Sequence, residues 1–431
     1  MKSIVQKKTR TQNNERALKW IKLFTITSSA QLFVQAVGLV SGIIVIRLLP
    51  TSEYALYTLA NTMLGTMTLL ADGGISNGVM AQGARVWQDR QKLGVVLTTG
   101  LNLRSKFSIG SLLVSTPILL YLLLHHGASW ITALLIVLSL VVAFYAALSD
   151  TLLEIAPKLN QAILPIQKNQ VNVGVWRLLL TGLTLFVFPW TFIAILAAGI
   201  PRIYGNLKLR KISNEFANST ALPDPEIRVE ILKVVKRVLP GAIYYSMSGQ
   251  ITIWLISILG NTSAVAQIGA LGRFAAVVTV LSGVVSTLFV PRFARLKEDS
   301  KTLLKYFCYY IGFLVLLCVG IVLMFKIFSS QALWILGPEY SALNNQLVLN
   351  IIGSCIGLIT GLSYLLCASR GWLPNPLWYI SLSLISVILG IQIFNVSTLE
   401  GVLIFNIFTS LIHSSIYLIY PIVKISKMPK L

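Results

Sequence analysis

Long apolar runs that contain almost no charge recur from one end of the chain to the other. Of the 431 residues, 55% are hydrophobic and only 11% are charged, whereas a soluble domain carries roughly 25% charged residues. A run of about 18 or more apolar residues is typical of a helix that spans a membrane. The segment Ile311–Phe325 is continuously apolar, while the strands of a membrane barrel alternate. The sequence therefore predicts an all-α integral membrane protein.

We expect about twelve transmembrane helices joined by short connections. They are predicted at residues 23–48, 54–74, 105–125, 131–154, 170–188, 190–206, 239–259, 264–290, 303–327, 342–367, 372–394 and 399–423. On the side opposite to the basic loops, the longest connection runs from Ser329 to Tyr340. This is far shorter than the roughly 50 residues of a small domain, so we expect no catalytic domain on that side.

The formal net charge of +21 follows the expected topology. Nearly all Lys and Arg residues fall in alternate connections. One of these, between the second and third predicted spans, holds Arg85, Arg90, Lys92, Arg104 and Lys106. Basic residues concentrate in the cytoplasmic loops of membrane proteins. We therefore expect both termini in the cytoplasm, an even number of spans, and no nucleic-acid partner.

The two halves of the chain resemble each other weakly. Ala81–Arg85 matches Pro291–Arg295, and Leu49–Pro50 matches Leu259–Gly260, both at an offset of 210 residues (295 minus 85). Six spans in each half give the halves the same orientation, which predicts two six-helix lobes related by a pseudo-two-fold axis along the membrane normal. The expected domains are a basic cytoplasmic segment (1–22), an N-lobe (23–206), a cytoplasmic linker (207–238) and a C-lobe with a short basic tail (239–431).

The cysteines and histidines do not suggest a metal site. All four cysteines lie inside predicted spans without a C-x-x-C pair, and the chain has only three histidines. Buried, small apolar roles suit such cysteines better than disulfides or metal ligands. We expect no metal and no cofactor.

Charged residues inside the predicted spans are the sharpest local signal, because a charge at the membrane centre costs roughly 2.5–3.5 kcal/mol on insertion scales. The candidates are Arg47, Arg177, Arg273, Asp72, Asp150 and Glu154. Such residues usually face a watery cavity or pair with one another. Those near a span end, namely Arg47, Asp150 and Glu154, have the alternative of reaching the interface with an extended side chain. Arg273 lies too deep for that, so it is the strongest candidate for a cavity.

Polar residues recur at helical spacing in four predicted spans, so that each set shares one helix face. The sets are Gln31 and Gln35 in span one, Asn61, Gly65, Thr68 and Asp72 in span two, Ser246, Gln250 and Ser257 in span seven, and Asn406, Ser410, His413 and Tyr417 in span twelve. Interhelical hydrogen bonds, worth about 0.6 kcal/mol each, would explain any single set. Sets in corresponding spans of both halves favour a central cavity.

Glycines at spacing four indicate close helix packing. Gly38 and Gly42 form a G-x-x-x-G in span one, and Gly353, Gly357 and Gly361 form a tandem one in span ten. Such a surface lets another helix backbone approach closely.

Three segments carry a family likeness. Arg47–Tyr57 resembles the R-L-L-G-P-x-E-F-G-x-Y junction of polysaccharide transporters, the Wzx-type flippases of lipid-linked oligosaccharides. Pro50 and Ala55 stand where that family usually has glycine. Ala71–Ser76 is similar to the family's A-D-L-G-L-S, and Ala266–Arg273 resembles its V-G-x-Y-x-x-A-x-R run without the tyrosine. The family belongs to the multidrug/oligosaccharidyl-lipid/polysaccharide (MOP) exporter superfamily, with the multidrug and toxin extruders (MATE) and the lipid II flippases.

This resemblance implies a MATE-like fold in the bacterial cytoplasmic (inner) membrane, and transport rather than enzymatic activity. The implied function is flipping of an undecaprenyl-diphosphate-linked oligosaccharide from the cytoplasmic to the external leaflet. The product would serve the assembly of a surface polysaccharide such as O-antigen lipopolysaccharide or exopolysaccharide. Implied partners are the bilayer, the lipid-linked oligosaccharide, a polysaccharide polymerase and chain-length proteins.

The candidate residues fit such a cargo. Because arginine binds phosphate bidentately, we expect the lipid diphosphate near Arg273 and Arg177. The other substrate-binding candidates are Arg47, Asn61, Gln31, Gln35 and Gln250. Transport would be driven by the membrane potential, or by proton or sodium coupling through Asp72, Asp150 and Glu154.

Two other functions stay open. A MATE-like drug or cation exporter would need acidic residues to dominate the cavity. A membrane glycosyltransferase or polymerase of lipid-linked sugars is expected to carry a large external loop, which the predicted topology lacks. An ATP-driven pump is disfavoured because no G-x-x-x-x-G-K-[ST] motif occurs.

Overall fold

The computed structural model describes residues 29–294, 296, 299–370, 372 and 375–427. The predicted basic segment 1–22 lies outside the described residues. Every regular element in the described part of the chain is a helix, so the prediction of an all-α architecture is confirmed.

Twelve long helices run through the described ranges. They are Ser29–Leu48 (the first helix), α2 (Thr51–Asp72), α4 (Arg90–His125), α5 (Trp130–Leu148), α8 (Ile163–Val187), α9 (Thr191–Phe216), α10 (Pro225–Leu259), α11 (Thr262–Ala294), α12 (Ser300–Ile327), α14 (Asn344–Ala368), α15 (Pro376–Ile393) and α16 (Leu399–Ser426). Each contains or overlaps one of the predicted spans.

Five short helices occupy the connections. They are α3 (Ile75–Val86), α6 (Asp150–Leu153), α7 (Ile155–Leu159), α13 (Ser329–Leu336) and the 3₁₀ helix η1 (Pro338–Tyr340). The break between α2 and α3 occurs at Gly73 and Gly74, whose φ angles of 50° and 94° lie in the left-handed region. Glycine adopts that region at low cost, so these two residues end α2 and redirect the chain.

Nine of the described helices are long and apolar enough to cross a membrane, and shorter apolar segments occur within α10 (Ser248–Leu259) and α15 (Trp378–Ile393). Helix α2 is less apolar, and half of its residues are buried. It packs against α4, α5, α9, α10 and α11. Because α2 packs against five other helices, its buried residues Thr58, Thr62 and Thr66 meet protein rather than lipid.

The same helix N-cap, an aspartate, recurs in both halves of the chain. Asp89 precedes α4 and accepts hydrogen bonds from the backbone N–H groups of Gln91 (3.0 Å) and Lys92 (3.1 Å). Asp299 precedes α12 and accepts one from the N–H of Thr302 (2.9 Å). An aspartate at the N-cap satisfies N–H groups that have no partner inside the helix. The two caps are 210 residues apart (299 minus 89), which is the offset of the sequence repeat.

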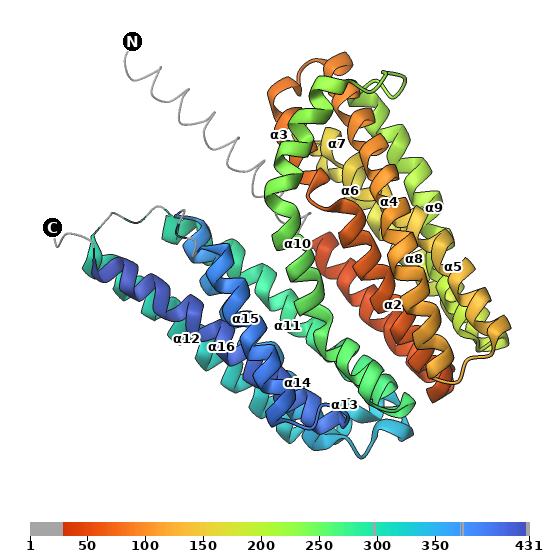
Figure 1. Cartoon of the computed structure of the whole chain (residues 1–431), viewed down its shortest axis with the longest axis vertical. Helices are drawn as coiled ribbons and strands as arrows, with labels where there is room; N and C mark the ends of the chain where they lie inside the picture. The colour runs from red at the N-terminus through yellow and green to blue at the C-terminus, as the bar shows by residue number, and fades with distance from the viewer. Residues whose placement is uncertain (1–28, 295, 297–298, 371, 373–374, 428–431) are drawn as a thin grey trace, which may run out of the picture.

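The helices form two bundles (Figure 1). The N bundle comprises the first helix to α9, and the C bundle comprises α11 to α16. Helix α10 runs between them: Ile231 and Val235, near its start, share a buried core with Ile75, Val79 and Leu93 of the N bundle, while α10 also packs against α11 and α16. The predicted linker 207–238 is therefore largely helical, formed by the end of α9 and the start of α10.

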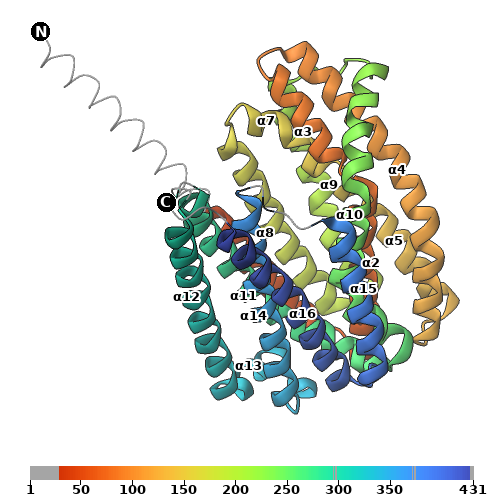
Figure 2. The ribbon, with the colours of Figure 1, turned by 60° about the vertical axis from the view of Figure 1, so that its left-hand side comes forward.

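The bundles converge at the end where α13 lies, called here the closed end, and diverge at the end of α3, called the open end (Figures 1 and 2). Two sets of hydrogen bonds join the bundles at the closed end. In the first, the Arg47 guanidinium donates to the backbone oxygens of Trp334 and Ile335 (2.8 Å for Ile335) and lies 5.5 Å from the Trp334 ring centre. Thr51 donates to Glu339 in the same set.

In the second set, the ring nitrogens of His126 lie 2.8 Å from the Ser257 oxygen and 3.1 Å from Thr262 Oγ1. The two sets mirror each other. In each set, the end of the helix that begins one half of the chain, the first helix or α10, meets the segment that follows α12 or α4 of the other half. The predicted basic connections lie at the open end, so the predicted topology would make this an inward-facing arrangement.

Candidate functional site

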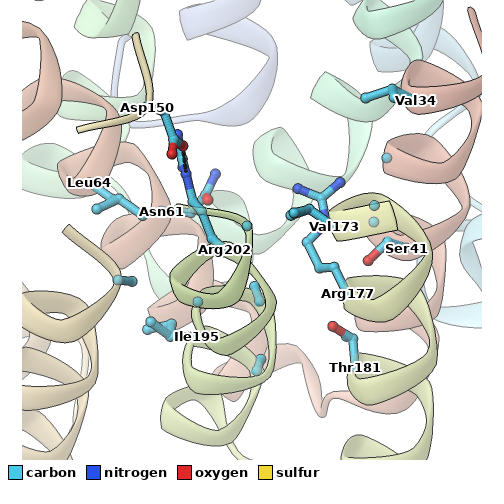
Figure 3. Close-up of a pocket in the computed structure, with 18 of the residues that line it drawn as sticks. Val34, Ser41, Asn61, Leu64, Asp150, Val173, Arg177, Thr181, Ile195 and Arg202 are labelled. Atoms are coloured by element: carbon cyan, nitrogen blue, oxygen red, sulfur yellow. Dashed lines mark hydrogen bonds and ion pairs between the residues drawn. The ribbon is translucent and has the colours of Figure 1, made fainter. Parts of the chain in front are cut away.

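A cavity of about 520 Å³ lies inside the N bundle (Figure 3). Its walls come from the first helix, α2, α5, α8 and α9, and one residue of α11, Arg273, completes it from the C-terminal half. It extends to Asp150, Glu154 and Gln170, beyond the end of α5 and near the start of α8. Part of the wall is apolar, with Val45, Leu140 and Ile195 among the lining residues.

Two arginines lie on one glycine face of the first helix. A Cβ added at Gly38 would lie 3.3 Å from Arg177 Nη2, and one added at Gly42 would lie 3.2 Å from Arg273 Nε. Residues four apart share a helix face and are separated by about 6 Å along the axis. The two guanidinium groups therefore lie next to each other, one helical turn apart, on the same wall.

This arrangement corrects one expectation. Gly38 and Gly42 were predicted to form a surface for close packing of another helix backbone, and that prediction is wrong. The atoms nearest to the place of each missing Cβ are arginine side-chain atoms. The missing side chains make room for guanidinium groups. The same prediction fails in span ten. The atom nearest to a Cβ at Gly353 is Nδ2 of the Asn406 side chain, at 2.9 Å, and no atom of the described residues lies within 4 Å of a Cβ at Gly357 or Gly361.

Neither arginine has a carboxylate partner among the described residues. Arg273 Nε donates to the hydroxyl of Tyr54 over 3.4 Å, with Tyr57 close by. Arg177 Nε is buried and makes no hydrogen bond in the described part of the chain. Arginine keeps its charge in proteins, and a buried charge without a partner is costly. The pair is therefore suited to bind an anion.

The acids of the cavity are already paired. Asp150 accepts from Arg202 Nε at 2.5 Å, as the dashed line in Figure 3 shows. Glu154 accepts from Lys158 Nζ (2.7 Å) and from the amide of Gln170 (2.8 Å). Each carboxylate thus has a cationic neighbour, and the charge without a counterion in this cavity belongs to Arg177 and Arg273.

The structure brings together five of the ten residues expected to act in transport. Those lining the cavity are Arg273, Arg177, Asn61, Asp150 and Glu154. Gln31 lies at its edge, where it donates to Gln170 over 3.3 Å. The other four are not among the lining residues: Gln35 is exposed, Gln250 lies half-buried on α10, Arg47 joins the closed end and Asp72 belongs to a separate ion pair. The side chain of Ser246, from the stripe in span seven, lies outside the described residues.

Asp72 pairs with Arg104, which is buried. Arg104 also donates to the hydroxyls of Ser76 (2.9 Å) and Thr151 (2.7 Å) and to the Leu148 oxygen (2.5 Å). The prediction that Arg104 lies in a cytoplasmic loop is wrong, because α4 begins at Arg90 rather than near 105. The signal was present, because several buried positions of α4 recur at helical spacing up to Arg104. They include Leu93, Val96, Leu97, Gly100 and Leu103.

Arg202 was counted with the basic residues of the central cytoplasmic loop, although it falls within the predicted span 190–206, and it lies within α9 in the cavity wall. The sequence carried a signal for this as well. The cavity-lining residues of α9 are small or apolar ones at helical spacing around Arg202: Ala194, Ile195, Ala198, Gly199, Gly205 and Leu209. A stripe of small residues with one charge indicates a cavity-facing helix surface.

No protein-family model and no curated protein matches the chain. Solved structures match over nearly its whole length. An inward-facing multidrug-resistance MATE family transporter of the MOP superfamily superposes with a TM-score of 0.71 at 14% identity, covering 91% of this chain and 94% of that one. The chain has the fold of MOP superfamily transporters. Because the identity is low, the match shows the fold alone.

Two further structures sharpen this result. An outward-facing MATE family transporter of the superfamily has a TM-score of 0.59 at 15% identity, with 94% of this chain and 95% of that one covered. The higher score of the inward-facing structure agrees with bundles that converge at the closed end. A MOP superfamily transporter from Pyrococcus furiosus, whose reverse binding-pocket polarity suggests a different function, has a TM-score of 0.61 at 15% identity and covers 95% and 96% of the two chains.

Proposed function

We propose that the protein is a flippase that moves an undecaprenyl-diphosphate-linked oligosaccharide from the cytoplasmic to the external leaflet by alternating access. One observation carries the proposal. Arg177 and Arg273 lie side by side on the glycine face of the first helix, without carboxylate partners among the described residues.

A diphosphate matches this pair in charge and in spacing. It brings about two negative charges into a site with two uncompensated positive charges, and guanidinium groups bind phosphate oxygens bidentately. The arginines are separated by about one helical turn, so each can contact one phosphate. The anion would supply the counterions that Arg177 and Arg273 lack.

The size of the cavity suits a polar head group. Its volume of about 520 Å³ falls within the roughly 300–1,000 Å³ of ligand pockets. The polyprenyl tail is too long for this space and would stay in the bilayer. Asn61 and Gln170, which line the cavity, offer amide groups to sugar hydroxyls.

A drug or cation exporter is the second candidate, and the cavity charges argue against it. A cationic cargo would need free carboxylates, but Asp150 and Glu154 already bind Arg202 and Lys158. The Pyrococcus furiosus transporter offers a precedent on the same fold, since the reversed polarity of its pocket suggests a different function. We apply the same reasoning to the cationic cavity of this chain.

The driving force follows from the charge of the cargo. An inside-negative membrane potential favours outward movement of an anion by roughly 2.3 kcal/mol per charge per 100 mV. Of the three acids considered for proton or sodium coupling, Asp150 and Glu154 line the cavity and Asp72 does not. We therefore assign any ion coupling to Asp150 and Glu154. A polysaccharide polymerase and chain-length proteins remain the predicted partners. The predicted location is the cytoplasmic membrane, with both termini in the cytoplasm.

Flipping in proteoliposomes tests the proposal. A fluorescent undecaprenyl-diphosphate-linked sugar is reconstituted with the protein, and its appearance in the opposite leaflet is followed by quenching. We expect Arg177→Gln and Arg273→Gln each to lower the rate about tenfold, the equivalent of roughly 1.4 kcal/mol. Lysine at either position keeps the charge without the bidentate geometry and is expected to give an intermediate rate.

Arg228→Gln is the matched control, because Arg228 is an exposed arginine near the start of α10. It is expected to flip the lipid at the wild-type rate. Wild-type rates for both cavity variants would contradict the proposal. Export of a cationic dye that survives in the arginine variants and fails in Glu154→Gln would favour the drug exporter instead.

A further inference from the structure

A cluster of aromatic side chains lies in the C-terminal half. Tyr244 of α10, Tyr364 of α14, Tyr379 of α15, and His413 and Tyr417 of α16 form this tyrosine cluster. The ring centres lie 5.9 Å apart for Tyr244 and Tyr379, 5.2 Å for Tyr379 and Tyr417, and 5.5 Å for Tyr364 and Tyr417. The imidazole of His413 lies 5.6 Å from the ring of Tyr379. Four helices thus contribute side chains to one cluster of packed aromatic rings.

The cluster occupies the place in the C-terminal half that the charged cavity occupies in the N-terminal half. The offset between the caps Asp89 and Asp299 is 210 residues. At that offset Tyr244 corresponds to Val34, Tyr364 to Glu154 and Tyr379 to Asn169, and all three counterparts line the cavity.

The two residues of α16 follow the same correspondence. His413 falls one residue from the counterpart of Arg202, and Tyr417 falls between the counterparts of Gly205 and Leu209. The helices correspond as well, since α10, α14, α15 and α16 are in the order of the first helix, α5, α8 and α9. The repeat therefore places two equivalent sites in the molecule, one ionic and one aromatic.

The chemistry of the cluster suits an uncharged, hydroxyl-rich ligand. Sugar rings present C–H faces that stack on aromatic rings and hydroxyl edges that hydrogen-bond to phenol groups. Tyrosine offers both a large apolar face and a polar tip. Tyr417 is 8% exposed and is buried within the cluster, whereas Tyr364 is 41% exposed. Ser383 hydrogen-bonds to His413 and holds the imidazole in place.

We propose that the tyrosine cluster is a second subsite, which binds the sugar part of the lipid-linked substrate. This inference rests on the proposed function. The diphosphate binds to the arginines of the N-terminal cavity, and the oligosaccharide reaches the aromatic surface of the C-terminal half. One substrate then contacts both bundles. A ligand that binds two bodies shifts their relative positions by its differential affinity for the two arrangements, so the sugar would help to trigger closure at the open end.

Binding to the full-length protein in nanodiscs, measured by native mass spectrometry, tests the subsite. Two probes are used: undecaprenyl diphosphate, and undecaprenyl diphosphate that carries a short oligosaccharide of N-acetylglucosamine units. We expect Tyr364→Ala to weaken binding of the sugar-bearing probe about fivefold, as one lost ring contact predicts, and to leave binding of the bare diphosphate within twofold. Tyr364→Phe keeps the stacking face and should lose less.

Tyr309→Ala is the control, because Tyr309 is 65% exposed on α12 and lies outside the cluster. It should change neither affinity. Equal effects of Tyr364→Ala on both probes, or no effect on either, would show that the cluster only packs α10, α14, α15 and α16 together. The proposed function would survive that result if Arg273→Gln weakened both probes alike. If neither probe binds the wild-type protein, both proposals are wrong.

Discussion

The N bundle and its counterpart in the second half share a frame but differ in chemistry. Both halves start a long helix behind an aspartate cap, Asp89 or Asp299, and both use the end of a leading helix to build the closed end. Charges occupy the cavity of the first half, and tyrosines occupy the matching place of the second. The two halves thus share helix caps and closed-end contacts, while the chemistry at the corresponding sites differs.

The comparison extends to the ion pair of Asp72 and Arg104. At the offset of 210 residues, Arg104 corresponds to Leu314, which is fully buried in α12, and Asp72 corresponds to Ser282. The second half therefore has a leucine and a serine at the positions where the first half has an ion pair.

The largest effect is expected when this pair is broken on one side. Arg104→Leu leaves the Asp72 carboxylate without its cation, which costs about 3 kcal/mol for a buried pair. Thermal unfolding in detergent should show a clear fall in Tm. Adding Asp72→Ser reproduces the arrangement of the second half, and this double variant should recover most of the loss, since apolar replacements of buried pairs are often neutral. A double variant less stable than Arg104→Leu would break the comparison.

The next largest effect concerns the closed end. Arg47→Gln removes the charge-assisted hydrogen bonds to the carbonyls of α13, worth roughly 1.5–3 kcal/mol when the donor is charged. We expect the population with an open external end to grow by at least about tenfold. Spin labels at His125 and Ala342, both exposed at this end, would report it as a longer distance, after the exposed Cys308 is replaced by serine. An unchanged distance distribution would contradict the assignment of Arg47 to the closed end.

A smaller effect is expected from filling the glycine face. Gly38→Leu places a side chain against Arg177, whose Nη2 lies 3.3 Å from the Cβ position. Binding of undecaprenyl diphosphate should weaken about fivefold, or close to 1 kcal/mol, because the guanidinium is pushed from its place. Gly320→Leu is the control, since no atom of the described residues lies within 4 Å of a Cβ at that exposed position. Equal affinities for the two variants would mean that the anion does not bind on this face.

The smallest effect distinguishes anion binding from cation binding in the same cavity. Asp150→Asn frees Arg202 from its carboxylate partner and adds one uncompensated positive charge. We expect the affinity for undecaprenyl diphosphate to rise about threefold, less than 1 kcal/mol, as measured in nanodiscs. A fall in affinity of similar size would contradict binding of the diphosphate near Arg202 and the neighbouring cavity arginines.

The sequence predicted the helical frame well. Apolar runs located the long helices because each must satisfy its backbone hydrogen bonds within the bilayer, and depth within a span singled out Arg273 and Arg177. Loop counting misplaced Arg104 because α4 begins before the expected span, and it assigned Arg202 to the central loop although Arg202 falls within the predicted span 190–206. Whether a charged side chain near the end of a helix lies in a loop or inside the bundle depends on its ion-pair partner. The partners Asp72 and Asp150 come from other helices, so the local sequence does not reveal them.

The role of Gly38 and Gly42 was equally beyond the sequence. A G-x-x-x-G face accepts a helix backbone or a long side chain equally well, and the identity of the neighbour depends on how α8 and α11 pack. The correspondence of the tyrosine cluster with the cavity also required the structure, since the rings come from four helices far apart in the chain.

The central claim is that Arg177 and Arg273 together bind an anionic head group. The most direct measurement is a cryo-EM structure of the protein with an undecaprenyl-diphosphate-linked sugar. The account predicts density for the two phosphates against the glycine face of the first helix, within hydrogen-bond distance of both guanidinium groups. A head group bound elsewhere, with both arginines turned away from it, would contradict the account.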